Sequence, residues 1–292
     1  MCSMLYANRL FRAILRHMKK IDGRALSAKI REDIKELIKN TNISPKLAVL
    51  LVGGDPASHL YVSLKEKAAA EVGIQTTEKK LPASVTTEEL ISIIEPWNND
   101  PEINGILVQL PLPQGIDEDA VIAAMDPKKD ADGFHPENIK ALLEGRGHII
   151  PPVHEGILRL IGATDTVING AHAVIIANSE IFSKPLNYLL QKAGATVKVF
   201  MPQEIDRETL AHADIIVIAI GQADFLKRGM ISPGACVIDV GTNKIPENRI
   251  VGDVDEKTLE EVTGWLSPVP GGVGPMTIAA LLKNVVNLAL KF

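Results

Sequence analysis

Tyr61 and Lys65 stand four residues apart in DPASHLYVSLKEKAAAEVGI, a segment whose pattern predicts a helix ending at Gly73. Side chains at positions i and i+4 of a helix project to the same side, so a phenol ring and an amine would face one ligand. A lysine acts as a base at neutral pH only where burial or nearby positive charge disfavours its ammonium form. The spacing alone favours a simpler interpretation, in which Lys65 and Lys67 belong to a solvated helix face.

Two further polar residues stand in apolar or acidic contexts that permit chemistry. Gln109 lies in LVQLPLP, at the end of a predicted buried strand, where an amide must find hydrogen bonds and where open α/β sheets place ligands. Structural and functional interpretations of Gln109 have equal weight. The segment KKDADGFHP contains Asp130, Asp132 and His135. Such a loop is most often a turn or helix cap, and the functional alternative is a carboxylate that accepts two N–H bonds from a heterocycle.

A candidate nucleotide turn lies in VIIANSEIFSKPLNYLL, residues 174–190. A strand, a turn and a helix in this order often hold a dinucleotide pyrophosphate, normally with glycines that let backbone N–H groups approach the phosphates. The turn from Asn178 to Lys184 contains no glycine. PGGVGPMT has three glycines before a helix, but the prolines upstream argue against the strand that a dinucleotide fingerprint requires. That loop is better suited to close approach of a ligand to the backbone.

No metal site is expected. The glycine of KKDADGFHP is misplaced for a calcium loop, and the seven histidines show no zinc-ligand spacing.

Short apolar strands alternate with helices along the chain, which predicts an α/β fold with parallel sheets covered on both faces. The predicted strands lie in KLAVLLVGG, NGILVQLPLP, AHAVIIA, TVKVF, DIIVIAIG and ACVIDVG. At 292 residues the chain suggests two domains, with a boundary in the Gly/Pro-rich stretch 145–155. The apolar C-terminal helix must pack against a domain, and we expect the first.

Composition limits the partners and the location. The chain is 46% hydrophobic with a net charge of −5, which argues against nucleic acid and anionic membranes, and no apolar run is expected to span a bilayer. Two cysteines predict a reducing compartment, and we expect a cytoplasmic protein. The Arg-rich, acid-free residues 1–20 fit an organelle transit peptide or an extra helix, but we favour translation from Met18 over Met1.

Taken together, these stretches resemble the methylenetetrahydrofolate dehydrogenase/methenyltetrahydrofolate cyclohydrolase family from about Ile21 onward. The motifs are VGGDPASHLYVSLKEKAAAEVGI, GILVQLPLP, KDADGFHPEN, GACVIDVGTN, VGDVD and PVPGGVGPMTIAALL. The resemblance implies two α/β domains with parallel sheets and a cleft between them. Residues 18–150 with 268–292 would form a folate-binding catalytic domain, and 151–267 a Rossmann-like dinucleotide domain. Residues 1–17 would be an extra segment.

The resemblance also implies activities and residue roles. The reactions are oxidation of 5,10-methylenetetrahydrofolate with NADP and hydrolysis of the methenyl product to 10-formyltetrahydrofolate, in a homodimer formed through the second domain. Lys65 would be the catalytic lysine, Tyr61 would stack near the folate ring, Gln109 would bond to the lysine, and Asp132 would hold the pterin's amino edge. Folate would also meet Pro270, Gly274 and Thr277. NADP would meet Ala177, Asn178, Ser179, Ile181, Gly221, Gly241 and Thr242.

The chain departs from the family pattern at the cofactor. Both glycines of the first turn are absent, and Asn178 replaces the basic residue that often grips the NADP 2′-phosphate. Phe200, Met201 and Pro202 replace the usual CHS-type stretch, and Asp224 stands where glycine is common. One alternative is therefore a cyclohydrolase whose dehydrogenase activity is lost or switched to NAD. A second alternative is a non-catalytic folate-binding dimer.

Overall fold

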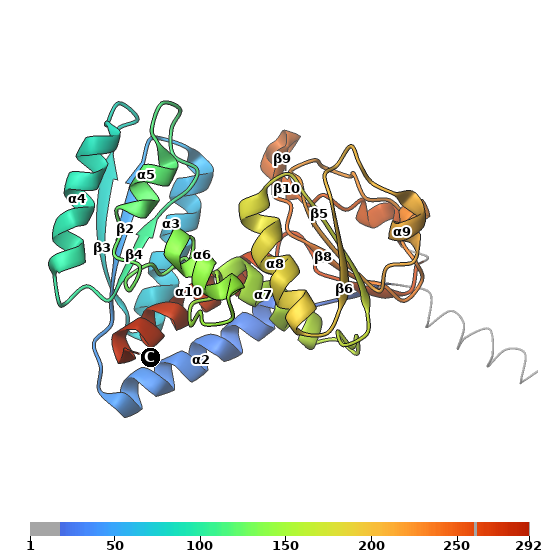
Figure 1. The fold of residues 1–292 in the computed structure, drawn as a ribbon, viewed down its shortest axis with the longest axis horizontal. Coiled ribbons are helices and arrows are strands. Elements are labelled where there is room, and N and C mark those ends of the chain that lie inside the picture. Colours follow the sequence, from blue (N-terminus) through green and yellow to red (C-terminus); the bar gives the residue numbers. More distant parts are fainter. Residues whose placement is uncertain (1–17, 260–261, 292) are drawn as a thin grey trace, which may run out of the picture. The chain divides into compact units, whose positions relative to one another are not determined.

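The computed structural model describes residues 18–259 and 262–291, which form two compact units (Figure 1). The first unit comprises residues 25–155 and those from 276 onward, and the second comprises residues 156–275 with the segment before Ala25. The extra segment 1–17, with its predicted helical spacing, lies outside the described residues.

The first unit is built on a parallel sheet of β3 (Gln75–Leu81), β2 (Lys46–Val52) and β4 (Gly105–Val108), in that order. Side chains alternate along a strand, so central β2 contributes to two cores. Leu47, Val49 and Leu51 join one cluster with α2 and α3, whereas Ala48, Leu50 and Val52 join another with α4 and α5. The helices of this unit are α2 (Gly23–Thr41), α3 (Pro56–Val72), α4 (Thr87–Asn99), α5 (Glu118–Ala123), α6 (Pro136–Leu143) and α10 (Val273–Leu290).

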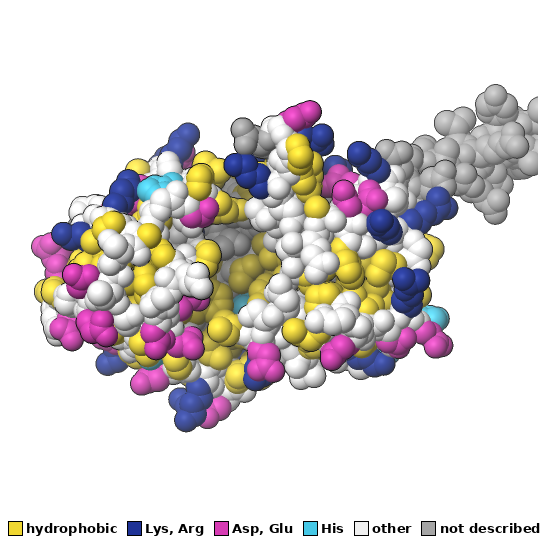
Figure 2. All heavy atoms as spheres, turned by 90° about the horizontal axis from the view of Figure 1, so that it is seen from above, with side chains coloured by type: hydrophobic (Ala, Val, Ile, Leu, Met, Phe, Trp, Pro, Cys, Tyr) yellow, Lys and Arg dark blue, Asp and Glu magenta, His cyan; other side chains and the backbone are white. Residues whose placement is uncertain are grey.

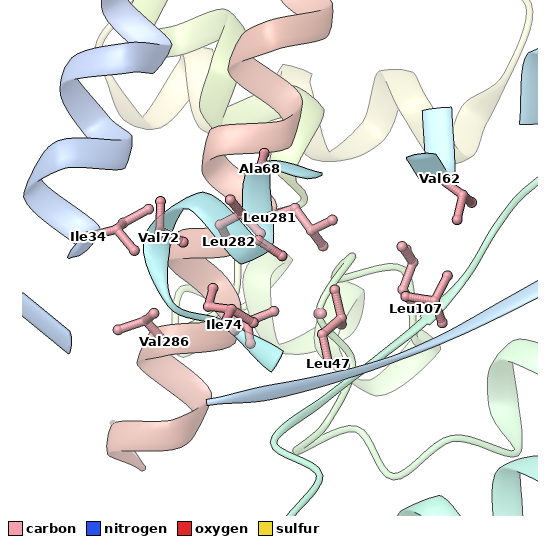
Figure 3. Close-up of a cluster of buried hydrophobic side chains, with 14 of the residues drawn as sticks. Ile34, Leu47, Val62, Ala68, Val72, Ile74, Leu107, Leu281, Leu282 and Val286 are labelled. Atoms are coloured by element: carbon pink, nitrogen blue, oxygen red, sulfur yellow. The ribbon is translucent and has the colours of Figure 1, made fainter. Parts of the chain in front are cut away.

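The C-terminal helix α10 is part of the first unit's core, as expected. Leu281, Leu282 and Val286 pack in one cluster with Ile34 of α2 and Val72 of α3 (Figure 3). By length and composition α10 could cross a membrane, which corrects the expectation that no segment is long and apolar enough. In this structure 44% of the helix is buried, and none of its residues is fully exposed. The same apolar composition is what a core helix of a globular domain requires.

The second unit contains a six-stranded sheet in the order β1-β11-β8-β7-β5-β6, and each neighbouring pair is parallel. Buried residues of β5, β7 and β8 pack with the segments that follow them into one hydrophobic cluster. A separate antiparallel pair joins β9 and β10. The elements are β1 (Met18–Lys20), α7 (Pro152–Gly162), β5 (His172–Ala177), α8 (Glu180–Lys192), β6 (Thr196–Phe200), α9 (Arg207–Ala211), β7 (Ile215–Ala219), β8 (Cys236–Asp239), β9 (Asn243–Ile245), β10 (Arg249–Val251) and β11 (Gly264–Leu266), with short 3₁₀ turns at Arg228–Met230, Pro246–Asn248 and Glu256–Leu259.

The division of the chain differs from the predicted domains at both ends. Residues 18–24 were expected in the first domain, but β1 pairs with β11, so they group with the second unit. The loop from residue 268 to Pro275 also groups with the second unit, although the helix that follows it belongs to the first. The sequence pattern could not predict the pairing of β1 with β11, since a three-residue strand carries too little periodicity to be recognised.

Candidate active site

Helix α3 positions Tyr61 and Lys65 in the first unit. Asp55 caps its N-terminus by accepting hydrogen bonds from the Ser58 backbone N–H and hydroxyl, both at 2.8 Å, and Gly73 ends it in a left-handed conformation. Lys65 is only 7% exposed, whereas Tyr61 one turn earlier is half-buried. The interpretation of Lys65 as part of a solvated helix face is therefore wrong, because its side chain points into the unit.

Gln109 holds the amine of Lys65. The Lys65 Nζ donates to Gln109 Oε1 at 3.0 Å, and Gln109 Nε2 donates to the carbonyl of Leu110 at 2.6 Å. The second bond fixes the amide orientation, so its oxygen must face the lysine. Gln109 directly follows β4, and its backbone N–H donates to Leu50 O of the neighbouring strand. The pair therefore lies at the carboxyl end of the parallel sheet, the edge at which open α/β sheets bind ligands.

Asp132 lies at the same edge. Two residues before it, Asp130 forms a parallel bridge with Ile106 of β4, so the segment continues beside that strand. Burial raises the pKa of the Asp132 carboxyl, and the nearby negative charge of Asp130 adds to this, while the positive charge of Lys65 opposes it. The structure thus brings Lys65, Gln109 and Asp132 together, although they lie far apart in the sequence.

Buried hydrogen bonds fix the segment that carries Asp132. The fully buried carboxylate of Asp130 accepts bonds from the backbone N–H groups of Gly133 and His135 and from the Asn138 side chain, at 2.8–2.9 Å. From α10, Asn284 Nδ2 donates to the carbonyls of Ala131 and Ile150 at 3.0 Å. From the sequence, Asp130 was expected only as part of an acidic loop, and Asn284 was not predicted to have a role.

This arrangement offers a buried amine, an oriented amide and a carboxylate within one polar site. The amine can exchange a proton with a substrate or water, and the carboxylate can accept N–H bonds from a ligand edge. Among residues 18–259 and 262–291, no three His, Cys, Asp or Glu side chains are grouped to hold a metal ion.

The remaining residues expected near folate lie around the start of α10. Pro270 is exposed, whereas Gly274 and Thr277 are half-buried and stand three residues apart, on one side of the helix. Pro270 and Gly274 belong to the second unit and Thr277 to the first.

The turn between β5 and α8 in the second unit is formed without glycine. Neither Asn178 nor Ser179 adopts a left-handed backbone, so the missing glycines do not prevent the turn. Ser179 makes no side-chain cap to α8, and the N-terminus of a helix that follows a strand in this way is the place where a pyrophosphate commonly binds. Asn178 Nδ2 donates to the carbonyl of Ile220 at 3.1 Å, and Glu180 pairs with Lys184 at 2.5 Å, so part of its negative charge is compensated.

The other expected cofactor residues occupy loops at the same sheet edge. Gly221 follows β7 and is exposed, Gly241 and Thr242 follow β8, and Ile181 on α8 is 56% exposed. Asp224, in place of the common glycine, adopts a left-handed backbone with φ 56°, a conformation that aspartate tolerates better than most residues.

Two buried carboxylates organise the loops after β7 and β8, and neither was predicted from the sequence to have a role. Asp239 and Asp253 are 2% and 0% exposed. Asp239 accepts bonds from the backbone N–H groups of Gly241, Asp253 and Val254, at 2.9–3.0 Å. Burial raises the pKa of Asp239 to about 7, and the charge of Asp253 contributes. The available signal was an aspartate within each of the apolar motifs VIDVG and VGDVD.

Gly252→Ala is expected to lower the free energy of unfolding by about 2–4 kcal/mol, because an added methyl would overlap the carboxylate of Asp239 and disrupt its buried bonds. Gly162→Ala is the matched control, since nothing lies within 4 Å of its added carbon. The control should be neutral or slightly stabilising. Urea denaturation of the two variants measures the difference, and equal stabilities would contradict the packing described here.

The second unit also has a hollow that lies away from the loops after β5, β7 and β8. A hollow of about 390 Å³ lies at the opposite, amino ends of the second unit's strands, lined by Asp165, Asn169, Gly170, Asp214 and Gly234 among others. On the face seen in Figure 2, basic and acidic side chains are interspersed. That surface does not have the basic stripe typical of proteins that bind nucleic acid.

Comparison with known families agrees with both parts of the site. Residues 21–132 match the model of the tetrahydrofolate dehydrogenase/cyclohydrolase catalytic domain, and residues 151–292 match that of the NAD(P)-binding domain of the same family. The first match contains Lys65, Gln109 and Asp132, and the second contains the turn at Asn178 and both buried aspartates.

Individual relatives are similar over nearly their whole length. The bifunctional protein FolD of Acetivibrio thermocellus is 46% identical over 276 residues, 93% of this chain and 96% of the relative. The crystal structure of the bifunctional FolD dehydrogenase/cyclohydrolase from Campylobacter jejuni has a TM-score of 0.89 at 41% identity, covering 94% of this chain and 99% of that one. The Trypanosoma brucei FolD, complexed with NADP cofactor and inhibitor, has a TM-score of 0.89 at 33% identity, covering 94% and 98%.

Proposed function

The chain belongs to the tetrahydrofolate dehydrogenase/cyclohydrolase family, and we propose from this that it oxidises 5,10-methylenetetrahydrofolate with NADP and hydrolyses the methenyl product to 10-formyltetrahydrofolate. The observation that carries the proposal is the buried Lys65 amine bonded to Gln109 beside the Asp132 carboxyl. A protein that only bound folate would not need an oriented amine at this place.

Lys65 supplies the proton transfers of the hydrolysis. The methenyl group is an amidinium-like cation, whose charge favours the neutral amine of a neighbouring lysine. The neutral amine accepts a proton from water as the water oxygen bonds to the methenyl carbon. The resulting ammonium group returns a proton to the departing ring nitrogen as its bond to that carbon breaks, which leaves the formyl group on the other nitrogen. One water is consumed and one proton is released overall.

Gln109 orients the Lys65 amine, and Asp132 binds the substrate. Gln109 Oε1 holds the Lys65 amine in one position, and the fixed amide prevents the lysine from turning away. Asp132, as a carboxylate, accepts N–H bonds from the pterin's amino edge, and Tyr61 offers a flat surface one helical turn from Lys65. These roles are supported by the placement of Lys65, Gln109 and Asp132 at one sheet edge, with Tyr61 one turn before Lys65 on α3.

The second unit has residues suited to bind the pyrophosphate of a dinucleotide. The N-terminus of α8 and the turn at Asn178 and Ser179 would hold the phosphates, and the loops at Gly221 and Gly241 would face the rest of the cofactor. Bound NADP supplies the hydride acceptor for the oxidation, and the protein contributes position.

Two assays on the purified protein test the proposal: methylene oxidation with NADP or NAD, and methenyl hydrolysis without either. Both activities are expected. Hydrolysis alone would select the cyclohydrolase alternative, oxidation only with NAD would select a changed cofactor, and folate binding without turnover would select the non-catalytic alternative.

Asn178→Arg is expected to raise the preference for NADP over NAD by about 10-fold, since an arginine can form charge-assisted bonds with the 2′-phosphate, and each tenfold step corresponds to about 1.4 kcal/mol. Asn178→Gln is the control, because it keeps an uncharged amide. Dissociation constants for both dinucleotides measure the ratio. An unchanged ratio in the arginine variant would show that residue 178 does not face the 2′ position.

We also propose that the protein is a homodimer formed through the second unit. The support is the edge strand β6, which lacks a partner on one side among the described strands and exposes 41% of Val199, next to Met201 at 37%. An exposed, apolar sheet edge favours association with a second copy. Light scattering should give twice the chain mass, and Val199→Lys should shift the protein toward monomer. A monomeric wild-type protein would reject the proposal.

A further inference from the structure

The loops that follow three neighbouring strands, β5, β7 and β8, are joined through one carboxylate in the second unit. Asp253 Oδ2 accepts the backbone N–H groups of Ile220 and Gly221 at 2.7 and 3.1 Å, and its Oδ1 accepts that of Gln222 at 2.8 Å. These three residues directly follow β7. Three successive N–H groups bound to one side chain fix the direction of this loop as it leaves the sheet.

The same carboxylate is also hydrogen-bonded to the segment that follows β8. Asp253 Oδ1 also accepts a bond from Asn243 Nδ2 at 2.9 Å, and Asn243 donates further to Gly252 O at 3.1 Å. Asp239, at the end of β8, accepts the N–H of Asp253 and that of Gly241. The turn after β5 joins through Asn178, which donates to the carbonyl of Ile220.

We propose that Asp253 is a positioning residue that holds these three loops in the arrangement a dinucleotide requires. The inference rests on the proposed function, because the loops lie at the carboxyl ends of parallel strands, where α/β sheets bind nucleotides. A fully buried carboxylate is costly unless its oxygens are satisfied, and here four N–H donors satisfy them. This cost is understandable if the carboxylate is needed to orient loops that lack the usual glycines at the first turn.

Asp253→Asn tests the proposal, since the amide keeps the volume but can accept bonds at only one of two atoms. The control is Asp214→Asn, because Asp214 accepts the His172 N–H at the opposite, amino end of the same sheet. Two measurements apply to each variant: NADP and NAD binding by calorimetry, and amide hydrogen exchange of residues 220–222. In Asp253→Asn we expect at least tenfold weaker binding and faster exchange. Asp214→Asn should match the wild type.

Methenyl hydrolysis separates positioning from general damage, because Lys65 and its partners lie in the other unit. Hydrolysis by Asp253→Asn should stay within about twofold of wild type, and a parallel loss of hydrolysis would overturn the positioning role. If Asp253→Asn does not fold, Asn243→Ala decides: it removes one donor, should weaken binding several-fold, and overturns the proposal if binding is unchanged.

The outcomes also distinguish this inference from the proposed function. Wild-type protein that binds neither dinucleotide would reject the oxidation and with it the ligand assigned to these loops. If the wild-type protein binds NADP and Asp253→Asn binds it equally tightly, only the positioning role is rejected.

Discussion

Replacing Lys65 with methionine is expected to reduce methenyl hydrolysis by about 10³-fold, within the range that general acid–base catalysis contributes. Methionine fills nearly the same volume as lysine but has no proton to exchange. Lys65 is only 7% exposed and its amine is bonded to Gln109, so the substitution removes a buried, positioned base. The absorbance of the methenyl substrate measures the rate directly.

A matched variant separates chemistry from folding in this experiment. Lys67→Met carries the same change two residues along α3, at an exposed position, and should keep full activity. Gln109→Glu should retain folate binding but change the pH profile, since a second titrating group would then contact the Lys65 amine. Normal hydrolysis by folded Lys65→Met protein would reject the catalytic assignment.

The residues of this site were predictable because they belong to long motifs, whereas their surroundings were not. The spacing of Tyr61 and Lys65 left a solvated helix face as the favoured interpretation, and only the resemblance gave Lys65 a role. Burial of Lys65 decides between these two interpretations, and burial follows from contacts between segments far apart in the sequence. Lys65 meets Gln109 because α3 and the end of β4 meet at one sheet edge. No local pattern contains that information.

Among the fold elements, the longer apolar strands and the edge strand β6 were predicted, whereas the charged strand β3 and the shortest strands were missed. β2 and β7 are continuous apolar runs, which is typical of strands covered on both faces. β3 reads QTTEKKL and was not recognised, because it lies at the edge of its sheet and carries charge there. β1, β9, β10 and β11 have three residues each, too few to show a period.

The conformation of the expected cofactor loops could not be predicted from the sequence either. The absent glycines at Asn178 and Ser179 suggested a damaged turn, but the turn forms with ordinary backbone angles. Asp239 and Asp253 hold the loops that follow β7 and β8, and they could not be recognised as a pair in the sequence because most of their bonds go to backbone N–H groups, which every residue type except proline provides. Sequence departures at such a site therefore indicate a change of side-chain contacts, not loss of the fold.

Asp132→Asn is expected to weaken folate binding by about 100-fold, because two charge-assisted bonds to the pterin edge would be lost, each worth about 1.5–3 kcal/mol. The amide presents one acceptor and one donor, and the donor would face the N–H groups of the ligand. The maximal rate should change less than KM, since Lys65 and Gln109 keep their bond. Initial rates of hydrolysis at varied substrate concentration give both constants.

The pH dependence provides an independent check on Asp132. The ionised carboxylate is the form that accepts both N–H bonds, and burial raises its pKa, so binding should weaken as pH falls toward and through that raised value. The loss should therefore begin at a higher pH than for a solvent-exposed aspartate, and Asp132→Asn should abolish this limb of the KM profile. Asp119→Asn, at an exposed position in the first turn of α5, should leave the limb in place. A limb that persists in Asp132→Asn would assign the titration to another group, and Asp130 would be the first to test, because burial raises its pKa as well.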